Sequence, residues 1–199
     1  MLFSGIASST SAAALSVCSV PSSVTVGDTA TVDVCISEIV DGAAPSLGVF
    51  DVEFGFDPAL LAFIGATYGD PVLGNQLDLF NLGSIQITTP GAATIGLFEL
   101  SLDLADDLDN LQAASFVLAR LTFDTLAAGS SALTLAVNAL GDSLGNALEG
   151  VSIVGANLLV SAPPSNEVSE PATLLLVPVA LWLVSATRRR ARTAHLRAP

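Results

Sequence analysis

Two stretches in which apolar and polar residues alternate strictly limit what this chain can fold into. They lie at residues 29–37 and 47–56, and the second is closed by Asp57-Pro58. Every second position is apolar. These positions are Val32, Val34 and Ile36 in the first stretch and Phe50, Val52, Phe54 and Phe56 in the second. This period of two is typical of β-strands with one buried face, and proline ends a strand because it supplies no ladder donor.

The rest of the chain up to residue 161 consists of short apolar segments separated by turn residues, with almost no helical periodicity. Further strands are expected at residues 15–20, 24–26, 60–67, 93–102, 115–124, 132–138 and 150–160, and residues 77–82 and 84–88 are weaker candidates on either side of Gly83. Turn signals recur about every eight to twelve residues, which is typical of a β-sandwich. Nothing repeats at a fixed period, which argues against a propeller or solenoid. The sequence therefore predicts an all-β sandwich of about nine strands.

Two parts of the chain together resemble the cohesin family of β-sandwich modules. The first comprises residues 24–29 and 47–61, where an apolar alternating strand is closed by Phe56-Asp57-Pro58 and followed by leucine. The second comprises residues 116–124, 129–131, 133–135 and 142–145. The resemblance implies a nine-stranded jelly roll and, as in the best-known members, a surface that binds dockerin modules. No motif fixes the positions of dockerin-contact residues, so none is carried over.

Near the C-terminus, an uncharged segment at residues 172–187 ends at a cluster of arginines. As a helix it would span about 24 Å, a little short of the roughly 30 Å hydrocarbon core of a bilayer. Trp182 and the arginine stems extend the reach by lying at the interface. Positive flanks tend to stay cytoplasmic, so we predict one transmembrane helix with the preceding chain outside the inner membrane. The cluster consists of Arg188, Arg189, Arg190 and Arg192.

The start of this segment carries Glu170-Pro171, with Thr173 two residues later. A short Glu-Pro motif, an apolar helix and an arginine cluster, in that order, resemble the PEP-CTERM sorting tail of exopolysaccharide-producing Gram-negative bacteria. Ser169 stands where that family usually has a first proline. The resemblance implies processing near Glu170 by an exosortase-like transpeptidase, a transient inner-membrane intermediate, and delivery to the cell surface or extracellular matrix. The alternative is an ordinary single-span anchor with a stop-transfer cluster.

The N-terminus, MLFSGIASSTSAAA, is small, uncharged and closed by three alanines, like the end of a secretory signal peptide. It has no basic n-region and only a weak apolar run, so we expect the true signal to begin upstream. The alternative is a Ser/Ala leader without function. The expected organisation is a signal remnant at 1–14, the sandwich at 15–161, a linker at 162–168 and the sorting tail at 169–192.

The charge distribution excludes two classes of partner. All nineteen acidic residues precede Pro171, and Arg120 is the only Lys or Arg before the arginine cluster. The chain before Pro171 therefore has a net charge of 1 − 19 = −18. A surface this acidic repels nucleic acid and anionic lipid, and neither is expected as a partner.

Cys18 and Cys35 are the only cysteines. Cys35 has the outward parity of its alternating strand, and Cys18 also faces outward if Leu15 and Val17 point inward. An exported domain lies in an oxidising compartment, so we predict a cross-strand disulfide. Two free, partly buried thiols are the alternative.

Residues 103–110 are rich in carboxylates, which offer hard oxygen ligands to Ca²⁺. The aspartates are Asp103, Asp106, Asp107 and Asp109. Their spacing lacks the alternating ligands and central glycine of an EF-hand, so a solvated acidic loop is the competing interpretation. No other cofactor is expected.

Catalysis has little support in the sequence. The only histidine, His195, follows the arginine cluster, so none is available outside to activate a Ser or Cys nucleophile or to ligate zinc. We predict a non-catalytic exported surface or matrix protein that binds protein or polysaccharide through its sandwich. The alternative is a carboxylate-dependent polysaccharide-active enzyme at the same location, because glycoside hydrolysis needs only two suitably spaced carboxylates.

Overall fold

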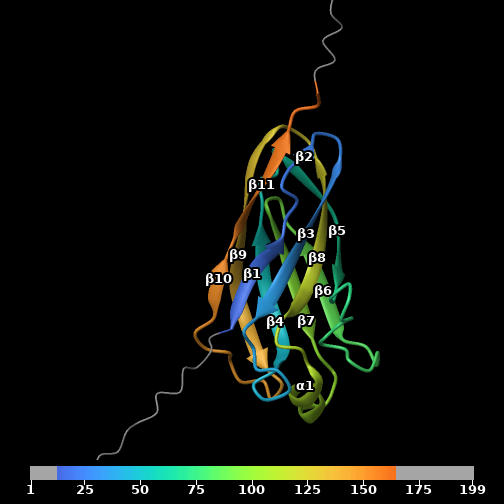
Figure 1. Ribbon diagram of the computed structural model, residues 1–199, viewed down its shortest axis with the longest axis vertical. Helices are drawn as coiled ribbons and strands as arrows, with labels where there is room; N and C mark the ends of the chain where they lie inside the picture. Colours follow the sequence, from blue (N-terminus) through green and yellow to red (C-terminus); the bar gives the residue numbers. More distant parts are fainter. Residues whose placement is uncertain (1–12, 165–199) are drawn as a thin grey trace, which may run out of the picture. The chain divides into compact units, whose positions relative to one another are not determined.

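The computed structural model describes residues 13–164 (Figure 1). Contacts divide the chain into two units, Met1–Pro163 and Pro164–Pro199. The described residues contain eleven strands and one short helix, so the predicted all-β class is confirmed. The elements are β1 (Ala14–Ser19), β2 (Val24–Thr25), β3 (Thr29–Ser37), β4 (Leu47–Gly55), β5 (Leu61–Tyr68), β6 (Ile85–Pro90), β7 (Thr94–Leu100), α1 (Ala105–Leu111), β8 (Phe116–Thr125), β9 (Gly129–Asp142), β10 (Ser152–Val154) and β11 (Ala156–Ser161).

The strands form two sheets, which confirms the predicted sandwich. One sheet has five strands in the order β10-β1-β3-β8-β5, and the other has six in the order β2-β11-β9-β4-β7-β6. Most neighbours are antiparallel, but β10 pairs with β1 and β2 pairs with β11 in parallel. Figure 1 shows α1 at one end of the sandwich, opposite the end at which β11 finishes. The strand count exceeds the expected nine because the candidate at 84–88 is the strand β6 and the segment predicted at 150–160 forms two strands, β10 and β11.

The core lies between the two sheets and contains the inward residues of both alternating stretches. Those of β3 and β4 are fully buried. Phe123 of β8 is the centre of an aromatic cluster, with its ring centroid 5.9 Å from that of Phe54, 5.2 Å from Phe56 and 5.8 Å from Phe63. Phe63 belongs to the same sheet as Phe123, whereas Phe54 belongs to the other. The cluster therefore joins the two layers.

The strand predicted at residues 77–82 is wrong, because this segment forms consecutive turns. The side-chain oxygen of Asn75 accepts a hydrogen bond from Leu77 N (3.0 Å), and a carboxylate oxygen of Asp78 accepts one from Gly83 N (3.0 Å). Asn and Asp side chains that bond nearby backbone N–H groups compete with a sheet ladder. The apolar residues of this segment therefore sit on turns rather than on a strand.

The single strand predicted at residues 150–160 is two strands in different sheets. β10 pairs with β1, and β11 pairs with β9. The chain changes sheet at Gly155, where a Cβ atom would lie 2.5 Å from the carbonyl oxygen of Leu133. Only glycine allows the two backbones to approach this closely. β9 also runs from Gly129 to Asp142 and so extends beyond both ends of the strand predicted at 132–138.

The acidic loop predicted at residues 103–110 is also corrected, because most of it is the helix α1. Asp106 and Asp107 lie in its first turn, where the positive end of the helix dipole favours carboxylates. Leu108 is its one buried residue. Seven residues with a single buried leucine give too little periodicity to distinguish a helix from a loop in the sequence.

The predictions for the chain ends fall mostly outside the described residues. They are the signal remnant up to residue 12, the linker beyond residue 164, and the sorting tail at 169–192 with its transmembrane helix. Within residues 13–164, no helix is both long enough and apolar enough to cross a membrane. The tail and its helix therefore stay predictions.

Candidate functional site

The outer face of the six-stranded sheet carries a continuous strip of apolar side chains over β4, β7 and β6. In the pairing of β4 with β7, Val49 lies opposite Leu100. In the pairing of β7 with β6, Leu100 lies opposite Ile85, and Phe98 lies opposite Ile87. Alternate residues of a strand share a face, so these five side chains point away from the core. We call them the apolar strip.

The apolar strip is accessible from outside. Ile85 is 45% exposed and Ile87 52%, and the other three side chains are partly exposed. Exposed leucines flank the two strands in sequence, with Leu82 at 75% before β6 and Leu102 at 57% after β7. Contiguous exposed apolar side chains mark an interaction surface more often than singly scattered ones do.

The strip exists because the usual pattern of a sandwich strand is inverted in β6. Gln86 and Thr88 have the inward parity of this edge strand, whereas its isoleucines point outward. The hydroxyl of Tyr68 donates a hydrogen bond to the Ile87 carbonyl oxygen (2.7 Å) and lies 3.0 Å from Thr88 Oγ1. Burial raises the pKa of this tyrosine, which keeps the hydroxyl protonated as a donor. Core packing alone does not explain two exposed isoleucines on an edge strand.

A buried glutamate holds the same strand in place from below. Glu99 of β7 is fully buried, and its Oε1 accepts hydrogen bonds from Asn75 Nδ2 (2.6 Å), Ser84 Oγ (2.5 Å) and Gln86 Nε2 (2.9 Å). Its Oε2 is buried and has no hydrogen-bond partner within the described part of the chain. The three bonds tie β6 and the segment before it to β7. Glu99 was not predicted as a functional residue, although an acidic side chain at the inward parity after Ile95 and Leu97 was a usable signal.

The start of β4 is held by a buried amide side chain, that of Gln112. The Oε1 of Gln112 accepts a hydrogen bond from Leu47 N (2.6 Å), and its Nε2 donates to the carbonyl oxygens of Leu47 and Gln76 (both 2.9 Å). The side chain thus bonds the backbone of Leu47 as a neighbouring strand would. These bonds fix the chain after α1 against β4 and against the 69–84 segment, the turns that connect β5 to β6. No sequence signal distinguished this glutamine from a surface residue.

The charged groups around the strip are all carboxylates. Asp51 and Glu53 of β4 have the outward parity of Val49, and Asp51 accepts a hydrogen bond from Asn138 Nδ2 (3.1 Å). Arg120 is the only Lys or Arg in residues 13–164, and it lies in the other sheet. The candidate surface is therefore apolar with an anionic border.

Arg120 is occupied by an ion pair with Asp33 of β3. Its Nε donates to Asp33 Oδ1 (2.7 Å) and its Nη2 to Oδ2 (2.8 Å). The hydrogen bond and charge of Asp33 raise the pKa of the guanidinium further, so it stays cationic. The outer face of the five-stranded sheet therefore carries a neutralised pair beside the disulfide, and it differs in chemistry from the apolar strip.

The predicted disulfide is confirmed. Cys18 and Cys35 are bonded, with their Cα atoms 5.8 Å apart. Cys18 lies at a bulge between Val17 and Ser19 where the register of β1 against β3 shifts. Leu15 and Val17 are buried, as the parity argument required. Closing a loop of this length contributes about 3 kcal/mol in the chain-entropy model.

The four aspartates considered for Ca²⁺ are not brought together. Asp103 accepts a hydrogen bond from Leu79 N (2.7 Å), and Asp109 accepts bonds from Ser46 Oγ and Ser143 Oγ. Within residues 13–164, no group of three or more His, Cys, Asp or Glu side chains is arranged to hold a metal ion. Asp103 and Asp109 therefore hydrogen-bond separate neighbouring segments of the chain. The sorting residues Glu170, Pro171 and Thr173 and the arginine cluster lie outside the described residues.

Two aspartates, Asp109 of α1 and Asp142 at the end of β9, should make the domain sensitive to acid. Hydrogen bonds from Ser46 and Ser143 lower the pKa of Asp109 below its ordinary 3.8. Burial alone would raise the pKa of Asp142, but bonds from the Asn146 side chain and nearby backbone N–H groups lower it. A carboxylate with a depressed folded-state pKa stabilises the fold fully above its unfolded pKa of about 4. That stabilisation is lost as the pH falls through the folded pKa.

The midpoint of urea unfolding should therefore be nearly constant between pH 7 and 5 and fall below about pH 4. Asp109→Asn should lower the midpoint at pH 7 and make its decline in acid shallower. Asp41→Asn, in an exposed loop, is the matched control. A decline that is as steep in Asp109→Asn as in the unaltered chain would contradict the assignment.

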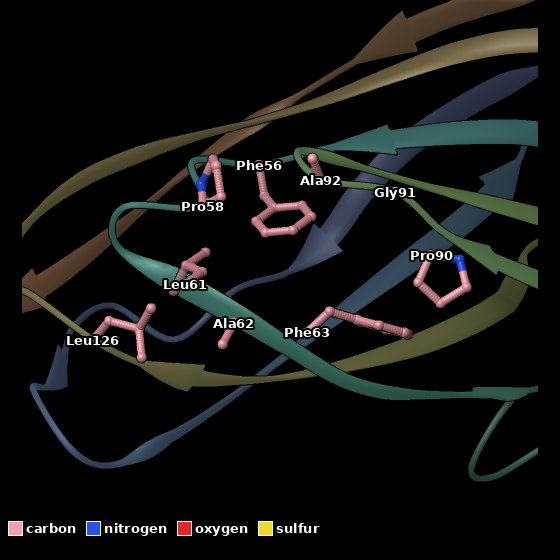
Figure 2. A pocket seen from close by; sticks show the side chains of 9 residues that line it. All are labelled: Phe56, Pro58, Leu61, Ala62, Phe63, Pro90, Gly91, Ala92 and Leu126. Carbon is pink, nitrogen blue, oxygen red and sulfur yellow. The ribbon is translucent and has the colours of Figure 1, made fainter.

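Two hollows flank the turn that joins β6 to β7. Figure 2 shows the first, an apolar pocket of about 290 Å³ whose lining includes Phe56, Phe63, Pro90 and Leu126. Phe56 and Phe63 also contact Phe123, so this pocket is the open margin of the aromatic cluster. The second, of about 240 Å³, lies over the outward residues of β4, β7 and β6 beside the apolar strip.

No protein-family model matches the chain, and no curated protein is similar to it in sequence. Solved structures do match. CaCohA2 from Clostridium acetobutylicum is 19% identical with a TM-score of 0.55, covering 76% of this chain and 92% of that one. A non-cellulosomal cohesin from the archaeon Archaeoglobus fulgidus is 14% identical with a TM-score of 0.55, covering 80% and 99%.

A third match comes from the Coh-OlpA–Doc918 cohesin–dockerin complex of Clostridium thermocellum. It is 12% identical with a TM-score of 0.58, and the match covers 75% of this chain and 99% of that one. At identities this low the similarity shows the fold and does not identify the function. The described part of the chain has the β-sandwich fold of the cohesins.

Proposed function

We propose that this chain is a non-catalytic protein-binding module of the cohesin type that docks a partner on the apolar strip. The observation that carries the proposal is the inverted pattern of β6, which places Ile85 and Ile87 outward beside Phe98 and Leu100. Similar solved structures include cohesins in complex with dockerins, among them Coh-OlpA–Doc918 and Coh-OlpC–Doc435. The proposed partner is therefore a dockerin-like protein module.

The composition of the surface suggests how docking would be divided between apolar and charged groups. Apolar side chains at the centre of an interface supply most of its affinity, and charges at the rim mainly set orientation and association rate. Here the centre is the apolar strip, and the rim contains Asp51 and Glu53. The partner is therefore expected to present an apolar ridge flanked by Lys or Arg.

The proposal is tested with the full chain and a panel of purified dockerin modules in a surface-binding assay. At least one dockerin should bind, and Ile87→Asp should weaken that binding by about tenfold or more, because it places a charge in the apolar centre. Ile153→Asp is the matched control, since Ile153 of β10 is exposed to a similar extent, 48% against 52%, on the other sheet.

Two results would count against docking on the strip. One is that no dockerin binds the unaltered chain. The other is that Ile153→Asp weakens binding as much as Ile87→Asp. Unfolding midpoints of both variants within a few degrees of the unaltered chain establish that any loss of binding does not come from unfolding.

We further propose that the tail at 169–192 is a sorting signal removed by an exosortase-like transpeptidase. The order of Glu170-Pro171, the apolar segment and the arginine cluster supports this, as does a segment somewhat short for a permanent anchor. Proline disfavours helix at the preceding residue, so we expect an extended backbone at Glu170 that a processing enzyme could bind. The proposed destination is the cell surface or extracellular matrix, with exopolysaccharide as a further contact.

The sorting proposal predicts the loss of the tail during maturation. One epitope is placed in the 41–46 loop and a second after Pro199, in a host that has an exosortase. The first should appear at the cell surface on a chain that has lost the second. Changing Glu170 and Pro171 to alanine together should retain the precursor in the inner membrane. Both epitopes on one inner-membrane polypeptide would instead support the ordinary anchor.

The alternative function is a carboxylate-dependent enzyme that acts on polysaccharide. A reducing-sugar assay over a panel of glycans separates it from a binding module. Turnover that Asp51→Asn or Glu53→Gln abolishes would favour the enzyme, whereas binding without turnover favours the module.

A further inference from the structure

The second hollow beside the β6–β7 turn has a chemistry different from that of the apolar strip. It measures about 240 Å³ and is lined by the polar side chains of Glu53, Thr89, Thr94 and Asn138, together with Pro90, Gly91 and Gly96. Three strands supply these residues around Gly96, and Asn138 comes from a fourth, β9. The hollow is thus built on the sheet, and the β6–β7 turn contributes Gly91 to one side of it.

The hollow exists because Gly96 has no side chain. Gly96 lies opposite Glu53 in the pairing of β7 with β4 and opposite Thr89 in the pairing with β6. A Cβ atom at Gly96 would lie 3.5 Å from Thr89 Cβ, which is ordinary van der Waals contact. The space is therefore large enough for a side chain, yet the sequence leaves it open between two outward polar residues.

The polar groups around the hollow are available for a ligand. Within residues 13–164, the carboxylate of Glu53 and the hydroxyls of Thr89 and Thr94 make none of the hydrogen bonds found in the structure, and Asn138 uses one N–H on Asp51. Phe98 lies two residues from Gly96 on the same face of β7, next along the strand from the hollow. Carboxylate, amide and hydroxyl groups together offer both donors and acceptors.

We propose that this hollow binds one unit of a neutral saccharide, a second binding function beyond protein docking. Sugar hydroxyls both donate and accept hydrogen bonds, so they match this mixed set, and a pyranose ring has an apolar face that suits Phe98. A basic side chain of a protein partner would use Glu53 but leave the amide and threonine donors without acceptors. Asp51 and Glu53 lie on this face without a cation, so acidic sugars are repelled.

The experiment uses the full chain labelled with ¹⁵N at glycine, because Gly91 and Gly96 line the hollow and report on it directly. Methyl β-glucopyranoside and methyl α-mannopyranoside are the neutral probes, and methyl β-glucuronide is the acidic match. At least one neutral probe should shift the Gly91 and Gly96 amide signals saturably, while Gly27 and Gly65 stay unchanged. The glucuronide should bind at least tenfold more weakly than its glucoside.

Two variants test whether the named residues form the site. Glu53→Ala and Asn138→Ala should each raise the dissociation constant, as measured from the shifts at Gly91 and Gly96, by about tenfold. This corresponds to the loss of a good hydrogen bond. Thr122→Val, on the outer face of the five-stranded sheet, should leave it unchanged. Unfolding midpoints show that each variant is folded.

Several outcomes would overturn the inference. They are no saturable shift with any neutral probe, equal binding of the glucuronide, and shifts that survive both Glu53→Ala and Asn138→Ala. A fourth is that n-butylammonium shifts Gly91 and Gly96 while neutral sugars do not, which would assign the hollow to a basic side chain of a partner. Dockerin binding depends on Ile87 and is measured separately, so failure of this inference leaves the proposed function standing.

Discussion

With methionine in place of Arg120, the free energy of unfolding is expected to fall by about 3 kcal/mol. Asp33 is only 4% exposed, and both of its carboxylate oxygens accept hydrogen bonds from Arg120. Methionine keeps most of the length of the side chain but leaves a buried carboxylate without its cation. The expected loss lies at the lower end for buried pairs because the arginine side chain is 38% exposed and water screens it. Guanidinium denaturation at pH 7 measures it.

The double variant Asp33→Val/Arg120→Met separates the charge effect from packing. It removes both charges, and apolar replacement of a buried ion pair is often neutral, so most of the lost stability should return. Asp124→Asn, on an exposed position of β8, should change stability by no more than about 0.5 kcal/mol. If Arg120→Met costs less than about 1 kcal/mol, Asp33 does not depend on Arg120 as described.

Replacing Phe123 with alanine should cost about 3–5 kcal/mol, the largest loss expected from a single substitution considered for this chain. The ring is fully buried and contacts the rings of Phe54, Phe56 and Phe63. Its removal takes away the transfer free energy of the side chain and leaves a cavity where the two sheets meet. The variant is compared with the unaltered chain by the midpoint and slope of guanidinium unfolding.

Phe80→Ala is the control of identical chemistry. Phe80 lies on the turns of the 69–84 segment and is 50% exposed, so the same deletion should cost less than about 1 kcal/mol. Similar losses in the two variants would show that the aromatic cluster around Phe123 does not join the sheets as described. The cluster also predicts that Phe56→Ala has an intermediate effect, because that residue lines the apolar pocket in Figure 2.

The strands with strict alternation were predictable because burial on one face imposes a period of two. β3 has the predicted bounds, and β4 ends one residue before the predicted position. The outward parity of Cys18 and Cys35 followed from the same alternation, and it was enough to predict their disulfide. Where one face of a strand is buried, the sequence carries its register.

The parts that could not be predicted depend on contacts between residues far apart in the chain. The turns at 77–82 follow from side-chain hydrogen bonds that the leucine pattern does not reveal. The helix α1 is held by one buried leucine, Leu108, and by hydrogen bonds of Asp109 and of Gln112 just after it. The apolar strip was not foreseen either. Its residues come from three strands, and their meeting on one outer face is a property of strand order, which alternation alone does not contain.

The parallel pairing of β1 with β10 and of β2 with β11 has a consequence for when the fold can close. Each sheet joins a strand from the beginning of the chain to one from its end, and β2 has no neighbour other than β11. During synthesis from the N-terminus, β2 therefore waits without a partner until nearly the whole sandwich has emerged. Such long-range pairing makes folding slow and gives the chain an extended period in an open, unpaired state. Because the sandwich is complete only when its last strands have paired, the chain can remain unfolded enough to be translocated through a membrane until that point.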